Sequence, residues 1–323
     1  MAEPRRIAVL TSGGDAPGMN AAIRAVVRSG LAAGLEVVGV RRGYRGLLEG
    51  DFIPMPAASV SGIVHRGGTI LMSARSEEFN TDQGMRKAAD NLRAQRIDAL
   101  IVIGGSGTAR GAHALCQSQG VPVILIPSSI DNDLGGTDYS IGFDTAVDTA
   151  VECIDRIRDT ATSIERVFVV EVMGRDRGFI ALAAGLAAGA ECIIVPEVPY
   201  RADCVTRIIE TGSARGKNSY IIVVAEGAAK GDQVAEDIRK VVDAQVRVSV
   251  LGYLQRGGNP TAFDRILGSR LGAAAVQAAL EGKAGQMVCL KNMAIETAPI
   301  DTVWKQAKVL DTSLLELAAN LAM

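Results

Sequence analysis

Val121-Pro-Val-Ile-Leu-Ile126 runs directly into Pro127-Ser-Ser-Ile-Asp-Asn-Asp133. The first six residues form an apolar run of strand length, which is typical of a parallel strand buried on both faces. Two carboxylates, two hydroxyls and an amide follow at its carboxyl end. Open α/β sheets bind their ligands beyond the carboxyl ends of their strands. The stretch therefore predicts a central strand that leads into a functional loop.

The spacing of Asp131 and Asp133 suits chemistry on a substrate. In an extended chain, residues i and i+2 point the same way, so we expect both carboxylates to face one pocket. One would accept a proton from a substrate hydroxyl, and the other would hold a divalent metal directly or through water. The alternative is an ordinary Asp/Asn-rich turn. The rest of the chain has to decide between the two.

Strand and helix patterns alternate along the chain. Besides the central strand, eight apolar runs have strand character, at residues 7–10, 35–40, 99–103, 167–172, 192–195, 220–225, 247–251 and 287–290. Helical patterns lie among them, and this alternation predicts parallel sheets with helices on both faces. Nine strands are more than one mononucleotide-binding half needs. We therefore predict an α/β protein of two doubly wound α/β/α (Rossmann-like) domains with parallel-rich sheets.

The domain border is expected to cross the chain more than once, because no linker or low-complexity segment marks a single boundary. We place the first crossing near residues 140–144. One domain then comprises residues 1–140 plus about 253–305, and the other comprises residues 141–252 plus about 306–323.

Composition excludes several classes of function. The net charge is −2 and the basic residues are dispersed, so no nucleic-acid partner is implied. Five scattered cysteines without a Cys-x-x-Cys pair, together with only two histidines, rule out a Cys/His zinc site. No signal peptide or run of 18 apolar residues is present, so we expect a cytoplasmic protein without a membrane partner.

Two glycine-rich loops, Ser12-Gly-Gly-Asp15 and Gly104-Gly-Ser-Gly-Thr108, each follow a strand and open a helix. Glycine allows the backbone to approach a phosphate, and the helix N-terminus supplies free N–H donors. Neither loop is a Walker A motif or has Gly-x-Gly-x-x-Gly spacing, so a dinucleotide-dependent dehydrogenase lacks its fingerprint. Both loops and the Asp-rich loop follow strands, which favours a site that handles phosphate.

Arginines recur beside glycines and strand ends, at Arg75, Arg166, Arg175, Arg247 and Arg256. The planar fork of arginine matches phosphate oxygens better than the point charge of lysine does. Any one of them is as readily an ordinary surface arginine. The five together favour a phosphorylated substrate.

Four blocks in this sequence closely resemble the signature blocks of the bacterial-type 6-phosphofructokinase family, in the order found in that family. They are residues 11–20 (TSGGDAPGMN), 127–133 (PSSIDND), 172–175 (VMGR) and 255–258 (QRGG). The resemblance extends from about Arg6 to the C-terminal helix. It implies transfer of a phosphoryl group, by family default from ATP, to the C1 hydroxyl of fructose 6-phosphate in glycolysis. It also implies Mg2+, allosteric control and a homotetramer with active sites at subunit borders.

The resemblance assigns roles by position. It makes the first domain the one that binds the phosphate donor and the second the one that binds the sugar phosphate. Asp131 would be the base, and the other catalytic residues would be Arg75, Arg175 and Ser129. The metal ligands would be Asp133 and Ser106. The nucleotide site would comprise Gly14, Tyr44, Arg75, Ser76, Ser106, Gly107, Thr108 and Gly111. The sugar-phosphate site would comprise Met173, Gly174, Glu226, Tyr253 and Arg256, with Arg166 and Arg247 from a neighbouring subunit. The effector site, for a nucleoside diphosphate or phosphoenolpyruvate, would comprise Arg24, Arg28, Arg158, Glu191, Arg215 and Lys217.

Three positions depart from the family pattern, and two of them concern the donor. The usual Gly-Gly-Asp-Gly loop is Gly-Gly-Ser-Gly here, so Ser106 replaces a carboxylate expected to hold the metal. Losing one such electrostatic partner would slow the reaction roughly 10²–10³-fold. Ser128 replaces the usual glycine, which puts a side chain near the phosphoryl path, and Tyr253 stands where the family often has a phosphate-binding histidine.

These departures leave two alternatives open. One is a sugar-phosphate-binding or regulatory subunit with little catalysis. The other is the same reaction with a different donor, ADP or pyrophosphate. Pyrophosphate is the weaker of these donors, because Gly107 and Ser128 stand where pyrophosphate-using relatives carry Asp and Lys.

Overall fold

The computed structural model describes residues 4–322 and divides into two compact units. Unit 1 comprises Met1–Ser129, Asp133–Asp144 and Arg256–Lys308, and unit 2 comprises Ile130–Asn132, Thr145–Gln255 and Val309–Met323. The chain thus passes between the units several times, including twice within the loop that follows the central strand. Which unit binds the donor and which the sugar phosphate remains a prediction.

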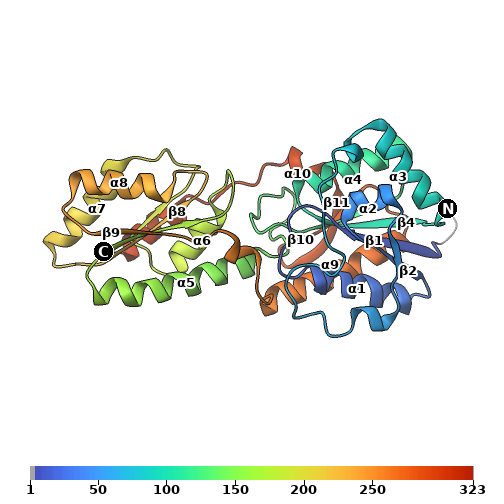
Figure 1. Ribbon diagram of the computed structural model, residues 1–323, viewed down its shortest axis with the longest axis horizontal. Coiled ribbons are helices and arrows are strands. Elements are labelled where there is room, and N and C mark those ends of the chain that lie inside the picture. Colours follow the sequence, from blue (N-terminus) through green and yellow to red (C-terminus); the bar gives the residue numbers. More distant parts are fainter. Residues whose placement is uncertain (1–3, 323) are drawn as a thin grey trace. The chain divides into compact units, whose positions relative to one another are not determined.

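Unit 1 is built on a seven-stranded sheet with the order β11-β10-β5-β4-β1-β2-β3 (Figure 1). The five inner strands are parallel, and they are β1 (Arg6–Thr11), β2 (Glu36–Val40), β4 (Ala99–Gly104), β5 (Val123–Pro127) and β10 (Gln286–Lys291). The edge strands, β3 (Phe52–Pro54) and β11 (Ala294–Pro299), each pair antiparallel with their neighbour. The predicted parallel-rich sheet is confirmed, and the two antiparallel edges are additions that the sequence pattern did not predict.

Helices cover both faces of this sheet (Figure 1). The helices of unit 1 are α1 (Met19–Ala32), α2 (Gly43–Glu49), α3 (Asp82–Ala94), α4 (Ser106–Gln119), α9 (Ala262–Leu280) and the short α10 (Thr302–Lys305). Side chains of α2, α3 and α4 share one apolar core with β1, β4 and β5. Helices α1 and α9 pack closely against each other, since a Cβ on Gly272 would lie only 2.7 Å from the Ala22 carbonyl oxygen.

The order of the strands explains where ligands bind in unit 1. From β1 the chain goes to β2 on one side, and β4 later joins the other side of β1. Such a reversal leaves a crevice at the carboxyl ends of the two central strands, where open α/β sheets bind ligands. The loops at this position are the two glycine-rich loops found in the sequence.

Unit 2 has a four-stranded parallel sheet with the order β7-β8-β6-β9. Its strands are β6 (Val167–Val172), β7 (Cys192–Ile194), β8 (Tyr220–Ala225) and β9 (Val246–Val250). Its helices are α5 (Phe143–Ser163), α6 (Phe179–Ala187), α7 (Ala202–Ala214), α8 (Gly231–Val241) and α11 (Ser313–Leu321), with the first two residues of α5 counted in unit 1. Helices α7 and α8 share a core with β6 and β8. Here the carboxyl ends of β6 and β9 mark the reversal of strand order.

No helix within residues 4–322 is both long and apolar enough to cross a membrane.

Candidate functional site

The loop after β1 is held down by hydroxyl groups. The Thr11 hydroxyl donates to the Met72 carbonyl oxygen at 2.9 Å, and the Ser73 hydroxyl donates to the Gly13 carbonyl oxygen at 2.6 Å. These bonds fix the segment around residues 69–76 to the glycine-rich loop. Arg75 belongs to this segment and is exposed, so its guanidinium is available to a ligand at the loop.

The loop after β4 packs against the same place. A Cβ on Gly104 would lie 2.4 Å from the Ser12 carbonyl oxygen, so this position tolerates only glycine. Helix α4 begins at Ser106, and its N-cap, Gly105, offers no side-chain oxygen to the free N–H groups of the first turn. Those N–H groups and the positive end of the helix dipole favour an anion.

Thr108 gives a second sign that this helix terminus is a site. Its side chain is buried, and its hydroxyl has no hydrogen-bond partner within residues 4–322. The hydroxyl oxygen lies 3.2 Å from where a Cβ of Gly13 would stand and 2.6 Å from where one of Gly104 would stand. A buried hydroxyl without a partner costs free energy unless a ligand satisfies it. The two glycine loops and Thr108 therefore suit a phosphate.

Two residues of the predicted nucleotide site, Tyr44 and Gly111, are buried on the core side of this helix, and their contact with the nucleotide remains a prediction. Tyr44 stacks on Phe79 with ring centroids 4.0 Å apart, and its hydroxyl donates to the Thr108 carbonyl oxygen at 2.6 Å. Burial raises the pKa of Tyr44 far above its usual range. A Cβ on Gly111 would lie 2.9 Å from the Tyr44 ring. Tyr44 and Gly111 thus support the first turns of α4 from below.

Ser76 and Gly107 remain close to the predicted nucleotide site. The Ser76 hydroxyl accepts a hydrogen bond from the Phe79 amide at 3.3 Å, which connects it to the same core. Gly107 is exposed in the first turn of α4, and a Cβ there would meet open space.

The loop after β5 does not run straight, contrary to the sequence-based expectation. Asp131 lies in a turn, and Asn132 has a left-handed φ of 50°. The two carboxylates are therefore not placed by an extended i, i+2 arrangement. Asp133 belongs to unit 1, where it accepts a hydrogen bond from the Ser129 hydroxyl at 3.2 Å, and Asp131 belongs to unit 2.

Ser128 also differs from expectation. Its side chain is buried, and its hydroxyl donates to the Ile141 carbonyl oxygen at 3.2 Å. Its amide donates to the Gly104 carbonyl oxygen at 3.0 Å, which joins the loops after β4 and β5. The hydroxyl therefore strengthens the loop internally, and the expectation of a side chain in the phosphoryl path is not met.

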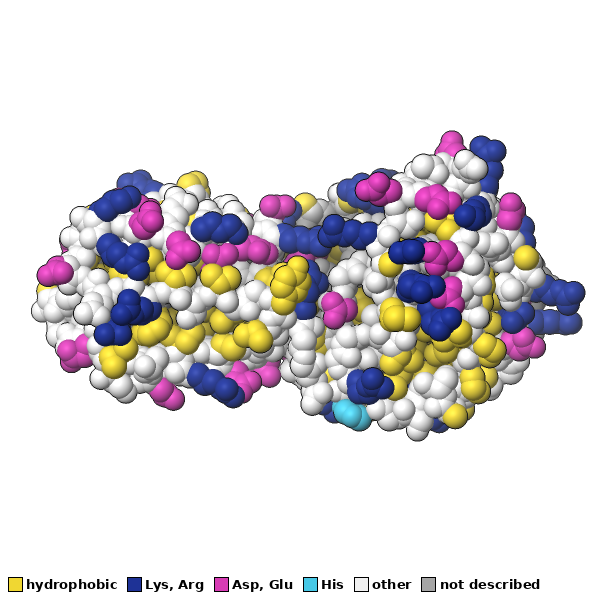
Figure 2. Space-filling model, in the orientation of Figure 1, with side chains coloured by type: hydrophobic (Ala, Val, Ile, Leu, Met, Phe, Trp, Pro, Cys, Tyr) yellow, Lys and Arg dark blue, Asp and Glu magenta, His cyan; other side chains and the backbone are white. Residues whose placement is uncertain are grey.

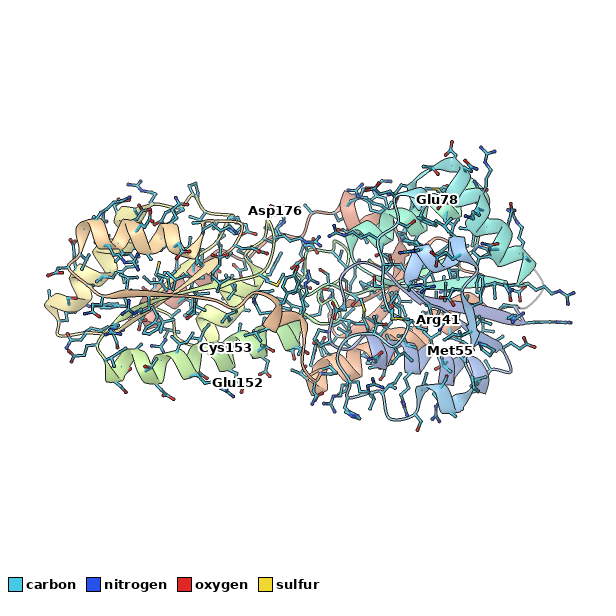
Figure 3. All side chains as sticks on the ribbon, in the orientation of Figure 1. Arg41, Met55, Glu78, Glu152, Cys153 and Asp176 are labelled. Carbon is cyan, nitrogen blue, oxygen red and sulfur yellow. The ribbon has the colours of Figure 1, made fainter. Side chains whose placement is uncertain are left out.

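Asp131 is almost completely buried and is paired with an arginine. Its Oδ2 lies 3.3 Å from Nε of Arg175, whose side chain is 57% exposed. The buried carboxylate could act as a base, and the exposed guanidinium beside it could bind a phosphate group. Asp176, labelled in Figure 3, is exposed on the same loop as Arg175.

The loop after β6, residues 173–178, is held by two side chains from other strands. Oε1 of Glu226, just beyond β8, accepts hydrogen bonds from the amides of Gly174 at 3.3 Å and Arg175 at 3.0 Å. Oε1 of Gln255, beyond β9, accepts one from the Met173 amide at 3.3 Å. Sequence reasoning quoted Gln255 as part of a motif but gave it no role, because its contact is with the backbone of a distant loop.

Arg256 and Tyr253 do not join this group. The guanidinium of Arg256 belongs to unit 1, where it donates to the Asp15 carbonyl oxygen at 3.3 Å. It covers Gly14 so closely that a Cβ there would lie 2.3 Å from Nη1. The Tyr253 side chain is 82% exposed. The predicted sugar-phosphate role of both residues remains a prediction.

Arg166 and Arg247 lie at the other end of the sheet of unit 2. Arg166 directly precedes β6, and Arg247 is the second residue of β9 and pairs in register with Phe168. Met173 follows β6 at its carboxyl end. A six-residue strand spans roughly 20 Å, so neither arginine reaches Met173 of its own chain by staying on this sheet.

Four of the predicted effector residues gather in unit 2. A pocket of about 420 Å³ is lined by Glu191, Arg215 and Lys217, together with residues of α7 and α11. The buried carboxylate of Glu191 pairs with Nζ of Lys217 at 2.8 Å and with Nη1 of Arg158 at 3.4 Å. The remaining two, Arg24 and Arg28, lie on α1 of unit 1.

The predicted metal ligands lie on adjacent loops of unit 1. Within residues 4–322, no three His, Cys, Asp or Glu side chains come together as a metal cage. In phosphoryl-transfer sites Mg2+ is usually held by one or two carboxylates together with substrate phosphates and water. A Cβ on Gly105, next to Ser106, would lie 3.8 Å from the Cβ of Ser129, which in turn bonds to Asp133. The Asp133 carboxylate and the Ser106 hydroxyl are oxygen ligands of the type that such a Mg2+ site uses.

Comparison with known proteins gives a consistent result. The sequence profile of the phosphofructokinase family matches residues 6–279. The ATP-dependent 6-phosphofructokinase 1 of Thermus thermophilus is 54% identical over 321 residues, covering 99% of this chain and all of that protein. An ATP-dependent 6-phosphofructokinase of Listeria monocytogenes is 51% identical over 319 residues, with the same coverage.

Solved structures give the same result. The phosphofructokinase structure from Saccharomyces cerevisiae superposes with a TM-score of 0.89 at 36% identity, covering 98% of this chain. This chain spans 48% of the yeast chain.

Proposed function

This chain belongs to the phosphofructokinase family, and we propose that it transfers the terminal phosphoryl group of ATP to the C1 hydroxyl of fructose 6-phosphate, giving fructose 1,6-bisphosphate. The reaction belongs to glycolysis, and the enzyme is a kinase. The observation that carries the proposal is the buried carboxylate of Asp131, 3.3 Å from the Arg175 guanidinium, on the loop after β5.

Asp131 takes the proton from the C1 hydroxyl as the oxygen attacks the terminal phosphorus. A positioned carboxylate of this kind contributes roughly 10²–10⁴-fold to the rate. Arg175 directs the carboxylate through their ion pair, and its exposed guanidinium offsets charge on the transferring group. Glu226 supports Arg175 by accepting its amide hydrogen bond.

Unit 1 supplies the donor side. The phosphates of ATP bind to the free N–H groups at the start of α4, to the Thr108 hydroxyl and to the backbone at Gly14, with Arg75 nearby. Asp133 and Ser106 would hold Mg2+ together with the phosphates, and the ion would supply positive charge that neutralises the phosphate oxygens. Ser129 orients the Asp133 carboxylate by its hydrogen bond.

Ser106 is the reason to test other donors as well. A neutral hydroxyl replaces the carboxylate that the family pattern places at this position. The metal site therefore has one negative charge fewer. ADP or pyrophosphate carries a different number of phosphate charges and would meet a different balance here. ATP remains our proposal, because both bacterial relatives described above are named as ATP-dependent.

We further propose that the protein acts as a homo-oligomer, by family default a tetramer. Arg166 and Arg247 lie at the amino ends of β6 and β9, where they serve a neighbouring subunit better than their own. Figure 2 shows apolar side chains gathered in a band on the visible face of unit 2, as an interface would have. Light scattering coupled to gel filtration measures the assembly, and a monomer would rule out this part of the proposal.

The unit 2 pocket lined by Glu191, Arg215 and Lys217 is our proposed effector site, for a nucleoside diphosphate or phosphoenolpyruvate. The effector role of Arg24 and Arg28, on α1 of unit 1, remains a prediction. Three cationic side chains at its wall, Arg207, Arg215 and Lys217, suit an anionic ligand.

The reaction is tested by turnover of fructose 6-phosphate with ATP, ADP, GTP and pyrophosphate in turn, each with Mg2+. We expect the highest kcat/KM with ATP. Binding of fructose 6-phosphate without turnover on any donor would instead indicate a regulatory subunit with little catalysis, the alternative that Ser106 favours.

A further inference from the structure

We propose that Gln255 is a positioning residue for the reaction. It holds the loop after β6 in a strained backbone conformation that directs the Arg175 side chain toward Asp131. This inference rests on the proposed function for its catalytic meaning. The clamp itself is a structural claim that can be tested without turnover.

The strain lies in the backbone of the loop. Arg175 has a left-handed φ of 51°, a conformation that costs free energy for any residue with a Cβ. Gly174, just before it, has a φ of 141°, which only glycine adopts readily. A backbone of this shape persists only where its surroundings fix it. The question is therefore which groups fix it.

Three successive amides of the loop are all bonded to side chains. The Met173 amide donates to Gln255 at 3.3 Å, and the next two amides donate to Glu226 at 3.3 and 3.0 Å. Gln255 is fully buried and is itself fixed, because its Nε2 donates to the Gly252 carbonyl oxygen at 3.1 Å. It therefore acts as a rigid bridge between the turn after β9 and the loop after β6.

Close packing completes the clamp. A Cβ on Gly227 would lie 2.0 Å from the Arg175 carbonyl oxygen. The segment after β8 therefore packs directly against the Arg175 backbone, in addition to the hydrogen bonds to Glu226. Strands β8, β6 and β9 are neighbours in a parallel sheet, so the loops at their carboxyl ends lie side by side.

The backbone matters because the side chain of Arg175 has little else to direct it. More than half of that side chain is exposed, and it forms an ion pair with the nearly buried Asp131. A flexible, solvated guanidinium reaches one carboxylate reliably only if its Cα is fixed. Gln255 thus acts on the reacting groups through the backbone of residues 173–175.

Gln255→Leu removes the acceptor and places an apolar side chain of similar size in the buried position. We expect kcat to fall about 10- to 100-fold with a smaller change in the KM for ATP, as for loss of one positioning contact. The matched control is Gln233→Leu on the exposed surface of α8, which should leave kcat unchanged. In an Arg175→Met background, Gln255→Leu should cost almost nothing further, because both changes remove the same aimed group.

Hydrogen exchange gives a readout that needs no activity. The amides of residues 173–175 should exchange at least 10-fold faster in Gln255→Leu than in the parent protein and in Gln233→Leu. Gly227→Ala leaves Gln255 in place and should show the same kinetic loss, which covers the case in which Gln255→Leu does not fold.

Equal exchange rates in the parent and Gln255→Leu would overturn the clamp, and so would a full additional loss of kcat in the Arg175→Met background. If the parent protein turns over no donor, the proposed function fails, and the exchange rates alone still decide whether the clamp exists.

Discussion

The glycine-rich loops of unit 1, our proposed donor site, and the loop after β6 in unit 2, part of our proposed acceptor site, are built in different ways. The loops after β1 and β4 present backbone N–H groups, glycines and one unsatisfied buried hydroxyl, and they leave these groups open for a ligand. The loop after β6 has already bonded three of its amides to Glu226 and Gln255. The hydrogen bonding of the loops after β1 and β4 is completed only by a ligand, whereas the loop after β6 is already fixed without one.

This difference bears on the departures from the family pattern. Ser106 and Ser128 both lie at the proposed donor site, where backbone groups would do most of the binding and the metal and phosphates would bring their own charge. The proposed acceptor site retains its carboxylate, Asp131, and its arginine, Arg175, and its one departure is the exposed Tyr253. We therefore expect donor-side substitutions to change donor use and acceptor-side substitutions to stop the reaction.

The largest effect is expected on the acceptor side, from Asp131→Asn. The amide cannot take the hydroxyl proton, so kcat should fall roughly 10²–10⁴-fold with fructose 6-phosphate binding largely kept. Steady-state kinetics and calorimetric titration of the sugar phosphate measure the two quantities. Asp176→Asn, on the loop after β6 that carries Arg175, is the control, and an equal loss there would show that removing any carboxylate near Arg175 is enough.

On the donor side, Gly104→Ala should give the next largest effect. The added Cβ would lie 2.4 Å from the Ser12 carbonyl oxygen, so the two phosphate loops must separate. We expect kcat/KM for ATP to fall about 100-fold, as for loss of preorganised donors. The control is Ser118→Ala, on the exposed surface of α4 away from its first turn. If both variants kept the parent kcat/KM, the loops would not form the donor site.

Ser106→Asp restores a carboxylate at the start of α4. We expect kcat with ATP to rise about 10-fold and the Mg2+ concentration for half-maximal rate to fall, because one more charged oxygen is available to the metal. Titration with Mg2+ at saturating ATP measures both. No change in either quantity would mean that the metal is held elsewhere, and Ser118→Asp on the same helix controls for added charge.

Lys217→Met tests the effector pocket. Removing the ammonium 2.8 Å from the buried Glu191 carboxylate should weaken binding of a nucleoside diphosphate about 10-fold, on the scale of one charged hydrogen bond. Binding is measured by calorimetry with ADP in the absence of fructose 6-phosphate. Lys240→Met on the exposed surface of α8 is the matched control. Unchanged affinity in the first variant would place the effector elsewhere.

The smallest effect is expected from Tyr44→Phe. The hydroxyl makes a buried bond of 2.6 Å to the Thr108 carbonyl oxygen, and its loss should cost about 1 kcal/mol of unfolding free energy. Urea unfolding measures this. The KM for ATP should change less than twofold, because Tyr44 supports α4 from the core. A large rise in that KM with unchanged stability would restore Tyr44 to the nucleotide site.

Much of the fold was predictable because buried parallel strands have a clear sequence pattern. The inner strands of both sheets are apolar runs, and the loops that follow β1, β4 and β5 were found from glycines and carboxylates at their ends. Strands β3 and β11 were missed because they are short or exposed edges without an apolar run. Helix α7 was missed because polar residues and a glycine interrupt its pattern.

The site was predictable in kind but less so in geometry. The left-handed φ of Asn132 separates the two carboxylates, and no residue pattern revealed it, since asparagine also adopts ordinary conformations. The burial of Tyr44 and the contact of Gln255 with the Met173 amide depend on residues far away in the sequence. Such long-range contacts are decided by packing, and sequence spacing carries no information about them.

The most direct test of the central claim is 31P nuclear magnetic resonance of fructose 6-phosphate incubated with ATP, Mg2+ and the enzyme. We predict a second phosphate-ester signal at the C1 position that grows as ADP appears, and no such signal with Asp131→Asn over the same time. Hydrolysis of ATP without a new sugar-phosphate signal, or equal product from the Asp131→Asn variant, would contradict the account.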